Sequence, residues 1–128
     1  MNTDFADGWS LAHVSWGMII HYVLSAVVPS SRSYAYLHLI IVIAIGAAWE
    51  LIENNKWVQS QFRKYGFPDY YGDSTRNMVG DQLFFAGGYF MAWLGPKWFV
   101  VLPMLLEVLM YLLMGDNTLI TVVRFLKK

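Results

Sequence analysis

Four apolar segments alternate with polar connections along the chain. The first ends at Pro29, the third at Gly95-Pro96 and the fourth at Gly115, whereas the second runs into a polar stretch near the middle. Each segment approaches the roughly 17–25 residues that a transmembrane helix needs. The expected spans are residues 10–28, 36–54, 76–94 and 98–114. The pattern therefore predicts an all-α integral membrane four-helix bundle, built as one polytopic domain over residues 1–128.

The polar connection between the second and third spans predicts a further helix. Apolar residues recur between positions 57 and 65 at the spacing of one helix face. This helix either continues the second span or begins after a kink at Asn54-Asn55. Gly66 and the residues after it end the pattern, and Asp73 or Ser74 is the expected N-cap of the third span.

A short apolar run closes the chain. Asp116, Asn117 and Thr118 follow Gly115 and are expected to cap a final helix. The run is too short to cross a bilayer and ends in two lysines. We therefore predict a short C-terminal helix that lies in the membrane interface.

Composition points to the lipid bilayer as the main partner. Hydrophobic residues make up 57% of the chain and charged residues 14%, against the roughly 25% charged residues of a soluble domain. The mean hydropathy is +0.42. Cysteine is absent, which excludes disulfides and thiolate metal sites. The net charge is zero and the basic residues are scattered, so composition disfavours nucleic-acid binding as well as a soluble enzyme.

The basic residues predict how the chain is oriented. With four spans, both termini and the central connection share one side of the membrane. Seven lysines and arginines fall on that side and two, Arg32 and Lys97, on the other, so we expect both termini to be cytoplasmic. The seven are Lys56, Arg63, Lys64, Arg76, Arg124, Lys127 and Lys128.

Polar residues from four segments fall at one level of the predicted bundle. Glu50 and Glu53 share a helix face near the end of the second span, and the third span begins with polar residues at i, i+4 and i+8. Placing a carboxylate in an apolar membrane segment costs free energy, so these residues indicate a functional site. The candidate polar site comprises Glu50, Glu53, Asn54, Asp73, Asn77, Asp81, His13 and Asp116.

Three interpretations of this acidic cluster stay open. Carboxylates repel one another unless a cation, a proton or a basic side chain intervenes. Oxygen ligands suit a divalent cation such as Mg²⁺, Mn²⁺ or Ca²⁺, and a histidine ligand would admit Zn²⁺ or iron. Alternatively, one carboxyl is protonated and acts as a general acid or base, or Arg76 or Lys56 neutralises a cluster that only locks helices together. The candidate metal ligands are Glu50, Glu53, Asp73, Asp81 and His13.

Isolated polar and small residues lie deeper in the spans. Glu107, in the middle of the fourth span, is expected to be protonated or to reach His21, and these two residues are the hints of a proton or ion pathway. His38 is expected at the opposite membrane face, in the interface. Close helix packing is expected at Gly80, Gly87 and Gly88.

The motifs of the chain resemble an uncharacterised family of small bacterial inner-membrane proteins. The resemblance rests on Trp49-Glu50-x-x-Glu53-Asn54, on the run from Asp69-Tyr70-Tyr71-Gly72-Asp73-Ser74 to Asn77 and Asp81, and on Gly115-Asp116-Asn117-x-Leu119. Ser10, His13 and Trp16-Gly17 stand where that family often has SH-x-x-HG, with Trp16 at the second histidine. More distantly, the arrangement is similar to VanZ-like proteins.

The resemblance implies a multi-pass protein of the bacterial inner membrane and assigns no reaction, so whether the protein is an enzyme stays open. Two hypotheses follow for its function. In the first, the polar site binds a metal ion or a headgroup and acts on a lipid-linked or amphiphilic substrate. In the second, the protein is a non-catalytic accessory subunit that joins other membrane-protein subunits, and the acidic cluster is a helix lock or docking patch.

Overall fold

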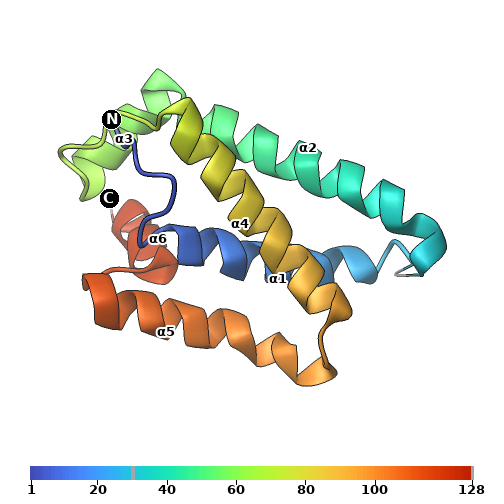
Figure 1. The fold of residues 1–128 in the computed structure, drawn as a ribbon. Helices are drawn as coiled ribbons and strands as arrows, with labels where there is room; N and C mark the ends of the chain where they lie inside the picture. Colours follow the sequence, from blue (N-terminus) through green and yellow to red (C-terminus); the bar gives the residue numbers. More distant parts are fainter. Residues whose placement is uncertain (30, 128) are drawn as a thin grey trace.

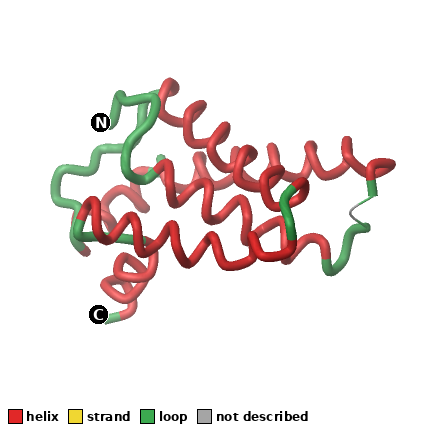
Figure 2. The backbone as a smooth tube through the Cα atoms, turned by 60° about the horizontal axis from the view of Figure 1, so that its bottom comes forward, coloured by secondary structure: helices red, strands yellow, loops and turns green. Residues whose placement is uncertain are grey.

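The computed structural model describes residues 1–29 and 31–127, and within them the chain is helical without strands (Figure 2). Lys128, which counts toward the expected cytoplasmic charge, lies outside the described residues. A 3-10 turn precedes each of two helices, at Arg32–Tyr34 and at Lys97–Val101. The α-helices are α1 (Ser10–Ser25), α2 (Ala35–Glu53), α3 (Lys56–Tyr65), α4 (Thr75–Leu94), α5 (Leu102–Met114) and α6 (Thr118–Leu126). The predicted all-α class is confirmed.

Two helical segments are long and apolar enough to cross a membrane. They are Arg32–Glu53, with 22 residues, and Lys97–Met114, with 18 residues. Most of their residues are exposed, as expected for helices that face lipid. The other two expected spans do not meet the same criterion, because α1 ends after 16 residues and the first turns of α4 carry Arg76, Asp81 and other polar groups.

The helices pack in the order α2, α4, α1, α5 across the molecule rather than as a closed bundle (Figure 1). The central pair is α1 and α4, which are far apart in the sequence. α2 packs on α4, and α5 packs on α1. α3, α6 and both chain ends lie together at one end of this row (Figure 1). Consecutive α-helices are therefore not the main packing partners of one another.

Close approach at two glycines explains why α1 and α4 form the central pair. A Cβ on Gly17 would lie 2.0 Å from the carbonyl oxygen of Phe85, and one on Gly88 would lie 2.1 Å from that of Val14. Only residues without a side chain let the two backbones come this close. Gly80 also lies close to a backbone, but to that of Phe5 in the N-terminal segment and not to a helix as expected. The expectation for Gly87 is wrong, because a Cβ there would meet nothing within 4 Å.

Asparagine or serine side chains cap the starts of α3, α4 and α6. The Asn55 side chain accepts a hydrogen bond from the Trp57 amide at 2.9 Å, so α3 is a separate helix and the chain kinks at Asn54-Asn55. Ser74 caps α4, and Asn117 caps α6 by accepting from the Ile120 amide at 2.9 Å. These caps satisfy backbone donors that a helix start leaves free.

Two polar residues of the predicted spans have partners that the sequence did not predict. His38 is fully buried instead of lying in an interface, because its ring contacts the Tyr89 hydroxyl and, at 3.2 Å, the carbonyl oxygen of Pro29. Glu107 does not reach His21. Its carboxylate accepts from the Thr118 amide at 2.9 Å and so supports the start of α6.

Candidate functional site

A cavity of about 570 Å³ lies between α1, α2 and α4, at the end covered by α3, α6 and the N-terminal segment. Carboxylates and one imidazole from the N-terminal segment, α1, α2, α4 and the connection before α4 share this space. They are Asp7, His13, Glu50, Glu53, Asp73 and Asp81. Residues separated by up to 74 positions thus meet because α1, α2 and α4 start or end at the same level.

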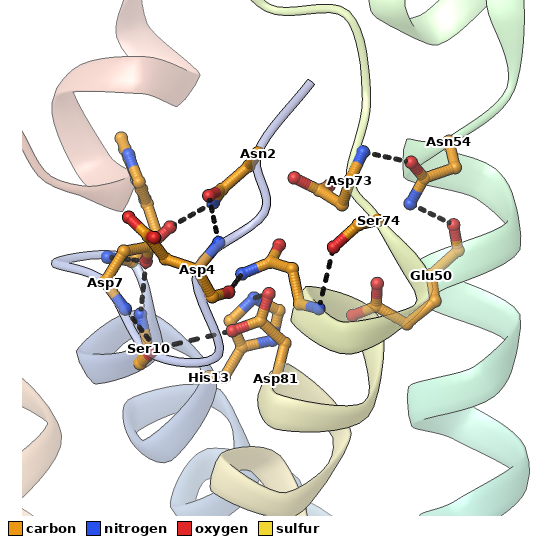
Figure 3. A network of polar contacts seen from close by, with 12 residues as sticks. Asn2, Asp4, Asp7, Ser10, His13, Glu50, Asn54, Asp73, Ser74 and Asp81 are labelled. Atoms are coloured by element: carbon orange, nitrogen blue, oxygen red, sulfur yellow. Dashed lines mark hydrogen bonds and ion pairs between the residues drawn. The ribbon is translucent and has the colours of Figure 1, made fainter.

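The structure places most of the predicted site residues at this cavity. His13, both glutamates, Asp73, Asn77 and Asp81 line it. Asn54 lies behind them, where its side-chain oxygen accepts from the Asp73 amide at 2.6 Å and its nitrogen donates to the Glu50 carbonyl oxygen at 3.0 Å (Figure 3). Asp116 is not brought to the cavity, because it pairs with Arg124 on α6.

The N-terminal segment is part of the site, which sequence reasoning missed. The Asn2 amide donates to the Gly72 carbonyl oxygen at 2.9 Å, and the Ser74 amide donates to the Asn2 carbonyl oxygen at 2.8 Å. Asn77 donates from its side chain to the Asp4 carbonyl oxygen at 2.8 Å. These bonds tie the segment to the start of α4 and place two N-terminal side chains, Asn2 and Asp7, at the cavity.

One sequence signal points to this placement. Asp7 and Ser10 stand three residues apart just before the first apolar run, the spacing of a helix N-terminus. In the structure, the Asp7 carboxylate accepts from the Trp9 amide at 2.7 Å and from the Ser10 amide at 3.2 Å. The Ser10 hydroxyl in turn accepts from the Asp7 amide at 3.0 Å. This reciprocal arrangement fixes the acidic segment against the start of α1.

Three side chains converge at the centre of the polar region (Figure 3). His13 Nε2 lies 3.6 Å from Asp81 Oδ2, and the Ser10 hydroxyl donates to Asp81 Oδ1 at 3.4 Å. Glu50 approaches the same pair from α2, so that one ligand atom from each of the three lies within 4.8 Å of the others. Glu50 and Asp81 are each only 5% exposed.

No lysine or arginine neutralises this cluster among the described residues that line the cavity. Arg76 and Lys56, which the helix-lock interpretation invoked, are both exposed. The guanidinium of Arg63 donates to the Tyr70 carbonyl oxygen at 2.8 Å and lies over the Tyr71 ring, and Arg63 does not line the cavity. The acidic side chains therefore meet one another and a histidine, without a basic partner inside the cavity.

Apolar side chains line the cavity on the other side of the polar residues. On α1, Trp16 and Ile20 follow His13, and Ile20 lies about 10 Å further along the helix at 1.5 Å per residue. Ile45 on α2 and Phe85 on α4 also line the cavity, about 7.5 Å and 6 Å along their helices from Glu50 and Asp81 at 1.5 Å per residue. The cavity thus joins an acidic region to an apolar one along the direction of the helices.

Aromatic side chains close the opposite end. Phe62 on α3 and Phe125 on α6 both line the cavity, and their ring centroids are 5.3 Å apart in an edge-on arrangement. Phe67, in the turn after α3, packs against Phe62 at 5.8 Å. The two amphipathic helices therefore cover the polar region with an aromatic layer.

Tyr70 and Asp73 form a side-chain hydrogen bond at this covered end. Tyr70 donates its hydroxyl to Asp73 Oδ2 at 2.5 Å. Burial raises the pKa of Asp73 above its ordinary value, and the Tyr70 hydrogen bond opposes that shift. Burial and the neighbouring carboxylates, Glu53 first, also raise the pKa of Tyr70, so the phenol stays protonated and remains a donor.

We expect Tyr70→Phe to destabilise the fold most at neutral and alkaline pH. There the hydrogen bond to an ionised carboxylate is lost, which costs about 1.5 kcal/mol or more, whereas a neutral acid loses about 0.5–1.5 kcal/mol. The pKa of Asp73 is raised above 3.8 in the folded state, so protonation of Asp73 favours the folded state. This contribution to stability is fully present below pH 3.8 and is lost as the pH rises through the raised pKa, where Asp73 becomes ionised.

The measurement is denaturant unfolding of both proteins at pH 8 and pH 4. Tyr71→Phe is the matched control, because the neighbouring Tyr71 is 60% exposed and keeps its ring against Arg63. An equal loss of stability at both pH values would show that the Tyr70 hydroxyl does not act through the ionised form of Asp73.

The fold and the cavity define a class: a small α-helical protein with two apolar helices long enough to span a membrane and an acid-lined cavity at one end. The chain belongs to the bacterial family described as protein of unknown function (DUF2585), whose model matches residues 2–128. The relationship to VanZ-like proteins stays an expectation from the motifs. No solved structure matches the chain.

Several relatives carry the name UPF0314 protein. The one from Brucella anthropi is 28% identical over 123 residues, which cover 94% of this chain and 62% of that protein. The one from Paracoccus denitrificans is 33% identical over 94 residues, covering 73% and 48%. The one from Sphingopyxis alaskensis is 31% identical over 90 residues, covering 70% and 47%. The chain thus spans about half to three fifths of the length of these relatives.

Proposed function

We propose that this protein binds the polar head of an amphiphilic molecule in its cavity while the apolar part lies between α1 and α2. The observation that carries the proposal is the division of one 570 Å³ cavity into an acidic region and an apolar region. Ligand sites of this size are common among proteins that bind small molecules, at about 300–1,000 Å³. An amphiphile matches both regions at once.

The packing of the helices supports access from the bilayer. α1 and α2 both pack on α4 rather than chiefly on each other. The residues that line the cavity between them are apolar and partly exposed, and Trp16 and Trp49 are 43% and 49% exposed. In a membrane, an acyl or isoprenoid chain would enter there without crossing polar surface.

The proposed setting is a bacterial inner membrane crossed by α1, α2, α4 and α5. The exposed apolar faces of α2 and α5 support this arrangement, since lipid is the solvent that covers them. α3, α6 and both chain ends lie at one end of the molecule, together with six described basic residues (Figure 1). By the positive-inside rule, that end and the cavity would face the cytoplasm.

The carboxylates favour a particular kind of headgroup. Carboxylate oxygens accept hydrogen bonds and repel an anion. The two side-chain polar atoms of Gln82 are buried at the cavity without a partner among the described groups. A headgroup that carries hydroxyls would donate to the acids and both donate to and accept from Gln82.

We expect Ile45→Trp to reduce amphiphile binding about tenfold, because the larger side chain fills the apolar region that Ile45 lines. The probe is a dodecyl glycoside with a diazirine in its alkyl chain, photolysed with the full chain in phosphatidylcholine nanodiscs. Ile43→Trp is the matched control on the same helix, since Ile43 is 49% exposed and does not line the cavity.

Mass spectrometry of the labelled peptides decides the outcome. The proposal predicts saturable labelling near Ile20 and Ile45 that unlabelled glycoside displaces. Labelling spread evenly over the outer faces of α2 and α5 would contradict it. Recovery of a stoichiometric membrane subunit seated over the cavity, with no saturable labelling, would favour the accessory-subunit alternative instead.

A further inference from the structure

His13, Glu50 and Asp81 come from three different helices and present their donor atoms to one point. One nitrogen or oxygen atom from each lies within 4.8 Å of the other two. For any three atoms so placed, a point exists within about 2.8 Å of all of them (4.8 Å divided by the square root of 3). Zinc ligands lie at about 2.0–2.2 Å, so small side-chain rotations would bring all three into coordination distance.

Glu50 supplies a second, independent observation. Only 5% of the residue is exposed, and it lines the cavity. Its Oε2 atom is buried without a hydrogen-bond partner among the described groups. Leaving a buried acceptor unsatisfied costs about 1–3 kcal/mol, and more for a charged group. A cation beside His13 and Asp81 would satisfy this oxygen and remove the repulsion between the two carboxylates.

We propose that His13, Glu50 and Asp81 bind one divalent transition-metal ion, with at least one coordination position open to the cavity. One imidazole nitrogen and two carboxylate oxygens suit Zn²⁺, Mn²⁺ or Fe²⁺, and three protein ligands leave a position free for water or a ligand atom. The open position faces the cavity because all three side chains line it. This site goes beyond the proposed amphiphile binding, and its test uses metal ions instead of the photoreactive glycoside.

The structure does not bring all five predicted metal ligands together into one site of mainly carboxylate oxygens. Glu53 and Asp73 line the cavity, but within the described chain they fall outside the one group whose atoms converge. Asp73 is engaged by the Tyr70 hydroxyl at 2.5 Å. Asn77 donates its amide to the N-terminal segment. The histidine-containing group therefore favours a transition ion over Mg²⁺ or Ca²⁺, which prefer six or more oxygens.

The test is a Co²⁺ titration of the chelator-stripped full chain in phosphatidylcholine nanodiscs, with empty nanodiscs as the blank. We expect one equivalent of Co²⁺ to give a visible absorption band, which one equivalent of Zn²⁺ abolishes and a hundredfold excess of Mg²⁺ or Ca²⁺ leaves intact. Glu50→Gln, Asp81→Asn and His13→Gln should each weaken binding at least tenfold.

Two variants serve as controls for charge and for position. Asp4→Asn removes an exposed carboxylate whose side chain does not line the cavity, and Glu53→Gln removes one that lines it outside the converging group. Both should retain the band. No band in the wild type, displacement of Co²⁺ by Mg²⁺, or an unchanged band in folded Glu50→Gln would each overturn the assignment.

A measurement on the wild type covers the case in which a variant fails to fold. Pulsed electron paramagnetic resonance of the Cu²⁺-loaded chain reports the number of coordinated imidazoles. The chain has three histidines, and the proposal requires that one of them, His13, binds the ion. Coupling to two imidazoles, or to none, would contradict the site. Because neither measurement uses the photoreactive glycoside, failure here leaves the labelling experiment with Ile45→Trp unaffected.

Discussion

Replacing Gly88 with valine is expected to lower the free energy of unfolding by about 2–3 kcal/mol, because overpacking a close contact forces backbone shifts. The first added carbon would lie 2.1 Å from the carbonyl oxygen of Val14, which is backbone and cannot rotate away. α1 and α4 would have to separate, and the cavity between them, α2 and the two amphipathic helices would lose its shape.

The neighbouring residue provides a matched control. Gly87→Val adds the same side chain to the same helix one position earlier, where nothing lies within 4 Å. Thermal unfolding followed by circular dichroism in detergent should show a lower midpoint for the Gly88 variant and little change for the Gly87 variant. Equal midpoints would mean that α1 and α4 do not cross at Gly88 as described.

Loading the cavity with a cation is expected to reverse its headgroup preference. Without the ion, the acidic region repels an anionic headgroup, and a photoreactive dodecyl phosphate should label the cavity poorly. With Zn²⁺ at His13, Glu50 and Asp81, a phosphate oxygen can occupy the open position, and labelling near Ile45 should rise about tenfold.

The comparison uses the wild type and Asp81→Asn, each with and without Zn²⁺. Labelling by the phosphate should depend on Zn²⁺ in the wild type only, whereas labelling by the neutral glycoside should occur in both. A Zn²⁺-dependent rise that persists in Asp81→Asn would place the phosphate on some other metal site. Inorganic phosphate as competitor distinguishes recognition of the headgroup alone from recognition of the whole amphiphile.

The parts of the fold that helix periodicity controls could be predicted from the sequence. Spacing of i, i+4 and i+8 puts Asn77 and Asp81 on one side of α4, and the boundary at Gly115 follows from the capping residue. At Asn54-Asn55 the sequence left open whether the helix continues or kinks, and the structure has the kink. Which helices pack together could not be predicted this way. That choice depends on Gly17 fitting against the backbone of Phe85 and on Gly88 fitting against that of Val14. The pattern of either helix alone does not contain the partner.

In the candidate site, too, some positions could be predicted from the sequence and others could not. Depth along a helix can be counted, so His13, Glu50 and Asp81 were expected at one level. Lateral position cannot be counted, and Asp116, at a similar level, instead turns to Arg124 on the following helix. The N-terminal segment was missed because it has no periodicity, and pairs through the backbone of Asn2 with residues 72 and 74.

The bond between Glu107 and the start of α6 has a mechanical consequence. Glu107 belongs to α5, whose outer face is apolar, while α6 contributes Thr121, Val122 and Phe125 to the cavity wall. The Thr118 amide donates to the Glu107 carboxylate and the Asn117 side chain donates to the Glu107 carbonyl oxygen at 3.2 Å, so the start of α6 is tied to α5. A thinner bilayer that tilts α5 would therefore displace Phe125, so lipid thickness would act on the cavity at a distance from it.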